Sequence, residues 1–378
     1  MRPEPALLIG LMSGTSLDGT DGVLVRFESG AGLQCLGHVH QAYEPALRAE
    51  LLTLNSAGPN ELHRAALAAN GVARAYGSVV AKLLERCGVA ASTVSVIGAH
   101  GQTVRHRPGE FDGSGYTLQL LNGALLAELS GIDVVCDLRS RDVAAGGQGA
   151  PLVPAAHRAL FGRDDEAVAV LNVGGIANLT LLPPGTEADA PVTGFDTGPG
   201  NALMDDWCER HTGRRFDDGG RWAAGGRVDA ALLRRLLADP FFDRAPPKST
   251  GRDLFHAAWL DAALRDAAKA IEPSDVQATL AELTAASASA ALRRHAPGTR
   301  RLMVCGGGAF NAHLMQRLAR HLPGVQVGST AQAGVAPDQV EAIAFAWLAR
   351  AFVTREPGNL PSVTGARAPR TLGALHPA

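Results

Sequence analysis

A short apolar run that ends in a glycine-rich turn occurs three times in this chain, and this pattern constrains the fold more than any other feature. Such a run is typical of a buried strand, and in two of the three cases a second apolar run follows, as in a hairpin. The same arrangement therefore opens both halves of the chain. We predict an α/β protein with two related α/β domains around a central cleft. The runs and turns are residues 6–12 with 13–19 and 22–27, residues 167–173 with 174–175 and 176–182, and residues 302–305 with 306–308.

Amphipathic segments separate these strands. Apolar side chains recur at helical spacing over residues 60–86, and similar patterns predict helices at residues 275–294 and 339–352. Short apolar runs at residues 94–98 and 134–136 predict two further strands, each of which leads into a polar loop. Strands that alternate with helices in this way are typical of an α/β fold.

Length and composition indicate a globular enzyme of two domains. The 378 residues exceed what one hydrophobic core usually organises, and we place the domains at residues 1–155 and 156–378. Hydrophobic residues make up 46% of the chain and charged residues 19%, which argues against extensive disorder. The formal net charge is -2 and the basic residues are scattered. We therefore expect no nucleic-acid partner and no membrane partner.

The five cysteines indicate a reducing compartment. Their number is odd, their spacing is wide and no C-x-x-C pair occurs, so we expect unpaired and mostly buried thiols. The N-terminus lacks the charged and apolar regions of a signal peptide. No apolar run approaches the roughly 18 residues that cross a bilayer. These observations predict a cytoplasmic protein.

The three glycine turns favour phosphate binding. Glycine lets the backbone approach a phosphate closely, and successive N–H groups form an anion-binding nest. The hydroxyls of Ser13, Thr15 and Ser16 would add donors to the first turn. Each turn could also be a tight turn and nothing more. Neither the P-loop pattern nor the dinucleotide-binding glycine pattern is present, and residues 247–251 imitate only the end of a P-loop, so we interpret them as a substrate-facing loop.

Three histidines stand out beside these turns. His38 and His40 flank one residue of an apolar stretch, but no carboxylate or cysteine completes the spacing of a metal site. We predict no protein-built zinc site there. His100 follows a predicted strand and is more simply explained as a structural histidine whose hydrogen bonds are satisfied than as a catalytic one.

Eight segments taken together carry a resemblance to a known family. In order and spacing the chain resembles the anhydro-N-acetylmuramic acid kinase family, nearly from end to end. That family belongs to the sugar kinase, actin and heat-shock ATPase superfamily, which implies a ribonuclease H-like core in each domain. A slightly long loop at residues 111–116 lies between the motifs. The segments are GLMSGTSLDGTD, AHGQTVRH, DLRSRDVAAGGQGAPLVP, LNVGGIAN, GFDTGPGNALMD, PKSTGRDLF, VCGGGAFN and TGARAPRTLGALHP.

The resemblance implies an ATP site, a sugar site and a catalytic base. Asp196, in a GFDTGPGN segment, matches the base of the family. Thr103, Arg141 and Glu341 match its substrate contacts, and a homodimer is implied. Asp18 and Asp21 are plausible partners for Mg²⁺ through water, because Mg²⁺ keeps much of its hydration shell. The implied contacts to ATP are Gly14, Thr15, Ser16, Leu17, Asp18, Gly19, Thr20 and Asp21 in the first turn, Asn172, Gly174 and Gly175 in the second, and Gly306, Gly307 and Gly308 in the third.

Several of these residues have simpler explanations. Asp196 precedes Thr-Gly-Pro-Gly and could form an Asx turn. Arg141 could form a surface ion pair with Asp142, which is the commoner fate of such a residue. Glu341 opens a predicted helix, where an acidic residue also stabilises the helix dipole.

The resemblance implies a reaction in which water opens the 1,6-anhydro bridge of the sugar at C1 while O6 accepts the γ-phosphoryl group of ATP. The products are N-acetylmuramate 6-phosphate and ADP, and the activity belongs to peptidoglycan recycling and amino-sugar catabolism. Two alternatives remain open at this point. The first is a kinase of the same fold that acts on an ordinary sugar hydroxyl. The second is a sugar sensor that binds nucleotide without turnover.

Overall fold

The computed structural model describes residues 7–378 except residues 15, 29–31, 188–189, 252–253 and 266–268. The chain divides into two compact units. The first contains Met1–Leu160 and Gln339–Ala378, and the second contains Phe161–Asp338. Thr15, one of the residues expected to contact ATP, lies outside the described residues.

A six-stranded sheet forms the centre of the first unit, in the order β13-β7-β4-β1-β2-β3. Strands β1, β2 and β3 form an antiparallel meander, whereas β4 and β7 continue the sheet parallel to β1. A separate antiparallel pair, β5 with β6, follows β4 along the chain. The strands are β1 (Leu7–Met12), β2 (Gly19–Glu28), β3 (Gly32–Ala42), β4 (Val96–Ala99), β5 (Gln102–Pro108), β6 (Gly115–Leu120), β7 (Val134–Cys136) and β13 (Ala374–His376).

Helix α2 (Glu61–Cys87) is the long helix that the apolar spacing predicted at residues 60–86. It buries Val72, Tyr76 and Leu83 against the sheet and ends at Gly88, whose φ of 63° suits a residue without a side chain. The other helices of this unit are short apart from α13. They are α1 (Pro45–Thr53), η1 (Ala91–Thr93), α3 (Gly123–Ser130), α4 (Ser140–Ala144), α5 (Val153–Phe161), α13 (Val340–Thr354) and α14 (Pro361–Thr364).

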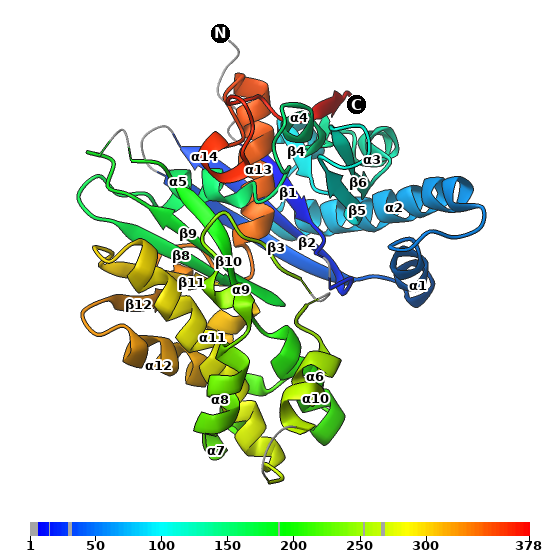
Figure 1. Ribbon diagram of the computed structural model, residues 1–378. Coiled ribbons are helices and arrows are strands. Elements are labelled where there is room, and N and C mark those ends of the chain that lie inside the picture. The colour runs from blue at the N-terminus through cyan, green and yellow to red at the C-terminus, as the bar shows by residue number, and fades with distance from the viewer. Residues whose placement is uncertain (1–6, 15, 29–31, 188–189, 252–253, 266–268) are drawn as a thin grey trace. The chain divides into compact units, whose positions relative to one another are not determined.

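Helix α13 confirms the helix predicted at residues 339–352, but its place in the fold corrects the predicted domain boundary. The segment Gln339–Ala378, which we expected in the C-terminal domain, belongs to the first unit. Figure 1 shows α13 in orange against the blue strands of this unit. The helix packs on β1 and β4 at Gly10 and Gly98, where an added Cβ would collide with the backbone of α13. These glycines let the returning helix approach the sheet closely.

The second unit repeats the sheet of the first. Its five strands have the order β10-β9-β8-β11-β12, in which β8, β9 and β10 are antiparallel and β11 and β12 continue parallel to β8. This order matches β3-β2-β1-β4-β7 strand for strand. The predicted pair of related α/β domains is therefore confirmed. The strands are β8 (Val168–Val173), β9 (Ile176–Leu182), β10 (Thr193–Pro199), β11 (Arg301–Cys305) and β12 (Gln326–Ser329).

Helix α11 (Pro273–His295) is the central helix of the second unit and confirms the helix predicted at residues 275–294. Most of its side chains are buried, because it packs on the sheet and on several helices at once. The other helices are α6 (Ala202–Thr212), η2 (Asp218–Gly220), α7 (Arg221–Gly225), α8 (Ala230–Leu237), α9 (Pro240–Asp243), α10 (Ala257–Arg265), η3 (Gly307–Phe310), α12 (Ala312–His321) and η4 (Thr330–Ala333).

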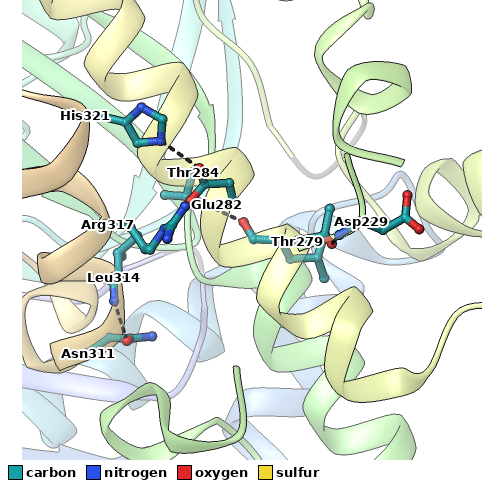
Figure 2. Close-up of polar contacts among 9 residues, drawn as sticks. Asp229, Thr279, Glu282, Thr284, Asn311, Leu314, Arg317 and His321 are labelled. Carbon is teal, nitrogen blue, oxygen red and sulfur yellow. Dashed lines mark hydrogen bonds and ion pairs between the residues drawn. The ribbon is translucent and has the colours of Figure 1, made fainter. Parts of the chain in front are cut away.

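A buried carboxylate joins α11 to α12, as Figure 2 shows. Glu282 of α11 is 5% exposed and accepts hydrogen bonds from Arg317 and from His321 Nε2, the latter at 2.8 Å. Burial raises the pKa of Glu282, but the bonds from Arg317 and His321 outweigh it and hold the pKa below its ordinary value. At the other end of α12, the Asn311 side chain caps the helix by accepting the N–H of Leu314 at 2.9 Å. These contacts hold α12 in place against the turn at residues 306–308, which it follows in the chain.

Candidate active site

The first glycine turn joins β1 to β2 and is held by its own carbonyl groups. The carbonyl of Ser13 accepts from His100 Nδ1 at 3.1 Å, and the carbonyl of Gly14 accepts from Gln102 Nε2 at 3.0 Å. The hydroxyl of Ser13 donates to the carbonyl of Gly101 at 3.0 Å. Because carbonyl and N–H point in opposite directions across a trans peptide, the bond from His100 turns the N–H of Gly14 away from the core. The turn therefore presents a backbone donor.

The polar residues that follow this turn differ in their accessibility. Asp18 is exposed and accepts from the hydroxyl of Ser16 at 2.7 Å. Thr20, by contrast, is fully buried, and Leu17 is buried with a φ of 55°. Asp18 is thus available to a ligand, whereas Thr20 lies in the interior.

Asp21 is bound by two histidines of the neighbouring strand. His38 Nε2 and His40 Nδ1 each lie 3.0 Å from the same oxygen, Oδ1 of Asp21. The pairing of β2 with β3 places Asp21 opposite His40. The histidines have no carboxylate near them in the sequence, and the one that binds them comes from the neighbouring strand. Within the described part of the chain no group of three or more His, Cys, Asp or Glu side chains is arranged to hold a metal ion. The second oxygen of Asp21 is not used by the histidines.

Glu341 lies near this turn, at the start of α13. Burial raises the pKa of Glu341; the positive charge of Arg139 opposes that rise, and the negative charges of Asp21 and Asp18 add to it. Arg139, Asp21 and Asp18 are thus close enough to Glu341 for their charges to influence its ionisation. Helix α13, which returns to this unit late in the sequence, is what carries Glu341 there.

Thr103 and Arg141, the other expected substrate contacts, lie on β5 and α4. Thr103 accepts a hydrogen bond from Gln119 Nε2 at 3.2 Å, and Arg141 is exposed. The surface ion pair considered for Arg141 and Asp142 is not what the structure shows. Asp142 is fully buried and accepts instead from the N–H of Gly149 at 2.7 Å and from two side chains of the C-terminal segment, Asn359 Nδ2 at 2.6 Å and Thr364 Oγ1 at 2.8 Å.

The second and third glycine turns meet within the second unit. The carbonyls of Gly174 and Gly175 accept from the N–H groups of Asn201 and Gly200, at 2.7 and 2.9 Å. Gly306 has a φ of 75°, and a Cβ there would collide with Asn172. Hence residues 172–175, 200–201 and 306–308, which lie far apart in the sequence, lie side by side in this unit.

A pocket of about 520 Å³ opens beside the third turn. Phe216 and Phe310 flank it, each 58% exposed, and exposed aromatic rings beside a pocket are suited to stacking on a planar ligand. The family resemblance implied contacts to ATP at residues 306–308, but Phe216 was not predicted, because no motif includes it. The pocket is lined by Asn201, Met204, Asp205, Phe216, Asp217, Asp218, Gly219, Gly307, Phe310 and Asn311.

Asp196 lies on β10 at a bulge in its pairing with β9. The N–H of Thr250 donates to Asp196 Oδ2 at 2.9 Å, and the N–H of Asp196 donates to the carbonyl of Lys248 at 3.1 Å. Burial raises the pKa of Asp196 to about 6, although the bond from Thr250 and the charge of Lys248 lower it. A carboxylate with a pKa in this range accepts a proton readily near neutral pH. The expected substrate-facing loop at residues 247–251 thus lies beside the expected base.

The lysine of this loop is anchored. Lys248 Nζ donates to the carbonyls of Phe241 and Phe242, each at 3.2 Å, and lies 4.6 Å from the centre of the Phe241 ring. Because α9 carries both phenylalanines, it fixes the loop and, through the loop, the orientation of Asp196. An Asx turn does not account for this residue, since its carboxylate accepts from a residue far along the chain.

The two repeated sheets, each with a glycine turn after its first strand, define the fold class of the sugar kinases and actin-like ATPases. The family model described as anhydro-N-acetylmuramic acid kinase matches residues 6–378. The chain belongs to the anhydro-N-acetylmuramic acid kinase family.

Relatives that carry this name align over almost their whole length. A protein of Variovorax paradoxus (strain S110) is 61% identical over 376 residues, which cover 98% of this chain and 99% of the relative. One from Cupriavidus pinatubonensis (strain JMP 134) is 57% identical over 378 residues and covers both chains fully. Among solved structures, the activator of 2-hydroxyisocaproyl-CoA dehydratase from Clostridium difficile, with bound ADPNP, aligns with a TM-score of 0.46 and 12% identity over 92% of this chain and 96% of that one.

Across the described residues, none of the helices has both the length and the apolar character needed to cross a membrane.

Proposed function

We propose that this protein opens 1,6-anhydro-N-acetylmuramic acid with water and phosphorylates its O6 with ATP, giving N-acetylmuramate 6-phosphate and ADP. The activity would serve peptidoglycan recycling and amino-sugar catabolism. Membership of the kinase family supports the reaction. The single structural observation that carries the mechanism is Asp196, a carboxylate whose pKa is raised to about 6 and whose Oδ2 is fixed by the N–H of Thr250.

Asp196 acts as the general base. It takes a proton from the water that attacks C1, as the base does in an inverting glycosidase. Such enzymes normally need a second carboxylic acid to protonate the leaving oxygen. Here the leaving O6 forms its new bond to the γ-phosphorus instead, so no general acid is required. Since Thr250 occupies Oδ2, the other oxygen of Asp196 remains to accept the proton.

Backbone groups of the glycine turns bind the nucleotide. The N–H of Gly14, turned outward by the bond from His100 to the Ser13 carbonyl, donates to a phosphate oxygen. The adenosine occupies the pocket beside Gly307, with its base against Phe216 or Phe310. Backbone donors of this kind offset the charge that develops during phosphoryl transfer, where most of the catalytic effect in kinases lies.

The acidic residues after the first turn fit a hydrated Mg²⁺ ion. The carboxylate of Asp18 is exposed, and Asp21 keeps one oxygen that the histidines do not use. Carboxylates that bind through water suit Mg²⁺, which retains several water ligands. Bound there, Mg²⁺ would neutralise negative charge on the phosphates. Asp18 and Asp21 would then hold the ion through its water ligands.

The sugar contacts are assigned to Thr103, Arg141 and Glu341. Arg141 is exposed on α4, whose position is fixed by the buried Asp142, and its guanidinium suits the lactyl carboxylate of the substrate. Glu341 suits the sugar hydroxyl groups or its amide as a hydrogen-bond partner. A homodimer in the cytoplasm completes the proposal, on the basis of the family resemblance and the pattern of cysteines.

A coupled assay of ADP release tests the proposal and separates it from the two alternatives. With the anhydro sugar, ADP and the 6-phosphate should form in equal amounts. Free N-acetylmuramic acid should give little product; if it is instead the better substrate, the protein is an ordinary sugar kinase. If ATP and the sugar bind, as calorimetry measures, but no ADP forms, the protein is a sensor.

A further inference from the structure

His100 links the first glycine turn to a buried arginine. Its Nδ1 lies 3.1 Å from the carbonyl of Ser13, so Nδ1 must carry the hydrogen. Its Nε2 then has a lone pair, which accepts from Arg139 Nε at 3.1 Å and from Arg139 Nη2 at 3.0 Å. Both nitrogens of the ring are therefore used, and each in the only role that its partner allows. Burial and the charge of Arg139 lower the pKa of His100 to about 3, so the ring is neutral in the working pH range.

Arg139 also holds the loop that follows α4. Its Nη1 donates to the carbonyl of Gly149 at 2.7 Å, while the N–H of Gly149 donates to Asp142 at 2.7 Å. The carbonyl and the N–H of Gly149, a residue with a φ of 68°, are thereby bound by Arg139, which directly precedes α4, and by Asp142 of α4. The same guanidinium thus contacts the phosphate turn through His100 and the Arg141-bearing helix through Gly149. Arginine can do this because its donors point in fixed and different directions.

We propose that His100 and Arg139 are positioning residues, through which the phosphate-binding turn and the sugar-binding helix α4 are held in one arrangement. His100 aims the N–H of Gly14 at the nucleotide by fixing the Ser13 carbonyl. Arg139 fixes His100 on one side and the loop after α4 on the other. This inference rests on the proposed function for the identity of the ligands, but the contacts themselves do not involve the reaction.

Changes at His100 and at Arg139 should affect ligand binding differently. The variant His100→Ala frees the Ser13 carbonyl and should weaken AMP-PNP binding about tenfold or more, the size expected for loss of a bond to a charged group, while the Kd of the anhydro sugar stays within about twofold. The variant Arg139→Lys keeps the charge but cannot reach His100 and Gly149 together, and should weaken both ligands. Calorimetry with each ligand alone measures these values without turnover.

Two further variants make the test specific. In His100→Gln the side chain again offers one donor and one acceptor, and nucleotide affinity should recover most of what His100→Ala loses. The exposed His63→Gln is the matched control and should leave both affinities unchanged. Thermal unfolding establishes that each variant is folded.

The proposal is overturned if His100→Ala binds AMP-PNP as the unaltered protein does, or if it weakens both ligands equally. It is also overturned if His100→Gln behaves as His100→Ala does. An unaltered protein that binds AMP-PNP but does not phosphorylate the anhydro sugar would refute the proposed function. The effect of His100→Ala on nucleotide binding would still decide the role of His100.

Discussion

At the scale of single residues, Asp196 carries the proposed chemistry, and removing its charge should abolish turnover. Asp196→Asn keeps the size of the side chain and an acceptor for the N–H of Thr250. It should lower kcat by at least about a hundredfold, the usual lower range for loss of a general base. The ADP-release assay measures this. Asp243→Asn, which removes another negative charge near Lys248, is the control and should remain active. Activity near that of the unaltered protein in Asp196→Asn would exclude it as the base.

The pH dependence should report the same residue. A base with a pKa of about 6 must be ionised to accept a proton, so kcat/KM should be constant above pH 7 and fall about tenfold per pH unit well below pH 6. Initial rates between pH 4.5 and about 8 test this expectation. A profile that stays flat to pH 4.5 would mean that the burial of Asp196 does not control the rate.

As the pH rises, the stability of the protein should fall while its activity rises. The folded-state pKa of Asp196 lies above its ordinary value of 3.8, so folding favours the protonated form, and this contribution is lost as pH rises through about 6. Asp196→Asn removes the ionised group and should raise the free energy of unfolding at pH 7.5 by on the order of 1–3 kcal/mol. The gain should vanish below about pH 4. Urea unfolding at the two pH values measures it, and a variant less stable at pH 7.5 would contradict the argument.

The sequence singled out Asp196 as the candidate base but not the residues that shift its pKa. Asp196 lies in a contiguous motif, and such motifs survive in a resemblance between sequences. The contacts with Thr250 and Lys248 depend on how a loop folds back beside β10, and no local pattern encodes that. The same holds for Asp21, because its two histidines become its partners only through the register of β2 against β3. The partners of Asp142 could not be predicted for the same reason, since Asn359 and Thr364 lie near the other end of the chain.

At the scale of elements, the contact of α13 with the first sheet depends on small residues. A Cβ on Gly98 would meet the carbonyl of Phe345, a backbone atom that cannot move alone. Gly98→Ala should therefore displace α13 and destabilise the protein by about 1–3 kcal/mol, as overpacked cores generally do. Gly298→Ala is the matched control, because nothing lies within 4 Å of its added Cβ. Thermal unfolding of both variants checks the difference. Equal melting temperatures would mean that the contact is not tight.

The elements that periodicity revealed were long or strongly apolar. Helices α2, α11 and α13 agree with the predicted segments within a few residues, since an amphipathic or buried helix repeats its pattern over several turns. Strand β10 could not be recognised in this way. Its seven residues include two glycines and a proline, and it forms a strand because β9 lies beside it. Whether such a segment forms a strand depends on its pairing with a neighbouring strand, and its own sequence does not show which strand that is.

At the scale of the whole molecule, the chain order of the two units could be predicted only in part. The repeated hairpins indicated two related domains, and the boundary at residue 160 lies near the predicted residue 155. The return of the chain to the first unit after residue 338 was not predicted. By its apolarity alone, a buried helix could pack on either sheet. Helix α13 fits the first sheet because Gly10 and Gly98 have no side chains and let the helix backbone approach the strands. The second unit is therefore an insertion into the first.

This topology predicts that the two units differ in their ability to fold alone. The second unit is one continuous segment, residues 161–338, with its own core around α11, so the isolated fragment should fold and unfold cooperatively in urea. The fragment of residues 1–160 lacks α13, whose buried face includes Ile343, Phe345 and Leu348. Without that helix, one face of β1 and β4 is exposed to water, and the fragment should be unfolded or aggregated. Joining residues 1–160 to residues 339–378 through a flexible Gly/Ser linker should restore a cooperative transition, because it returns the missing helix. Circular dichroism and urea titration of these three chains test the prediction. A cooperative transition of the 1–160 fragment alone would show that α13 is not needed to complete the first unit.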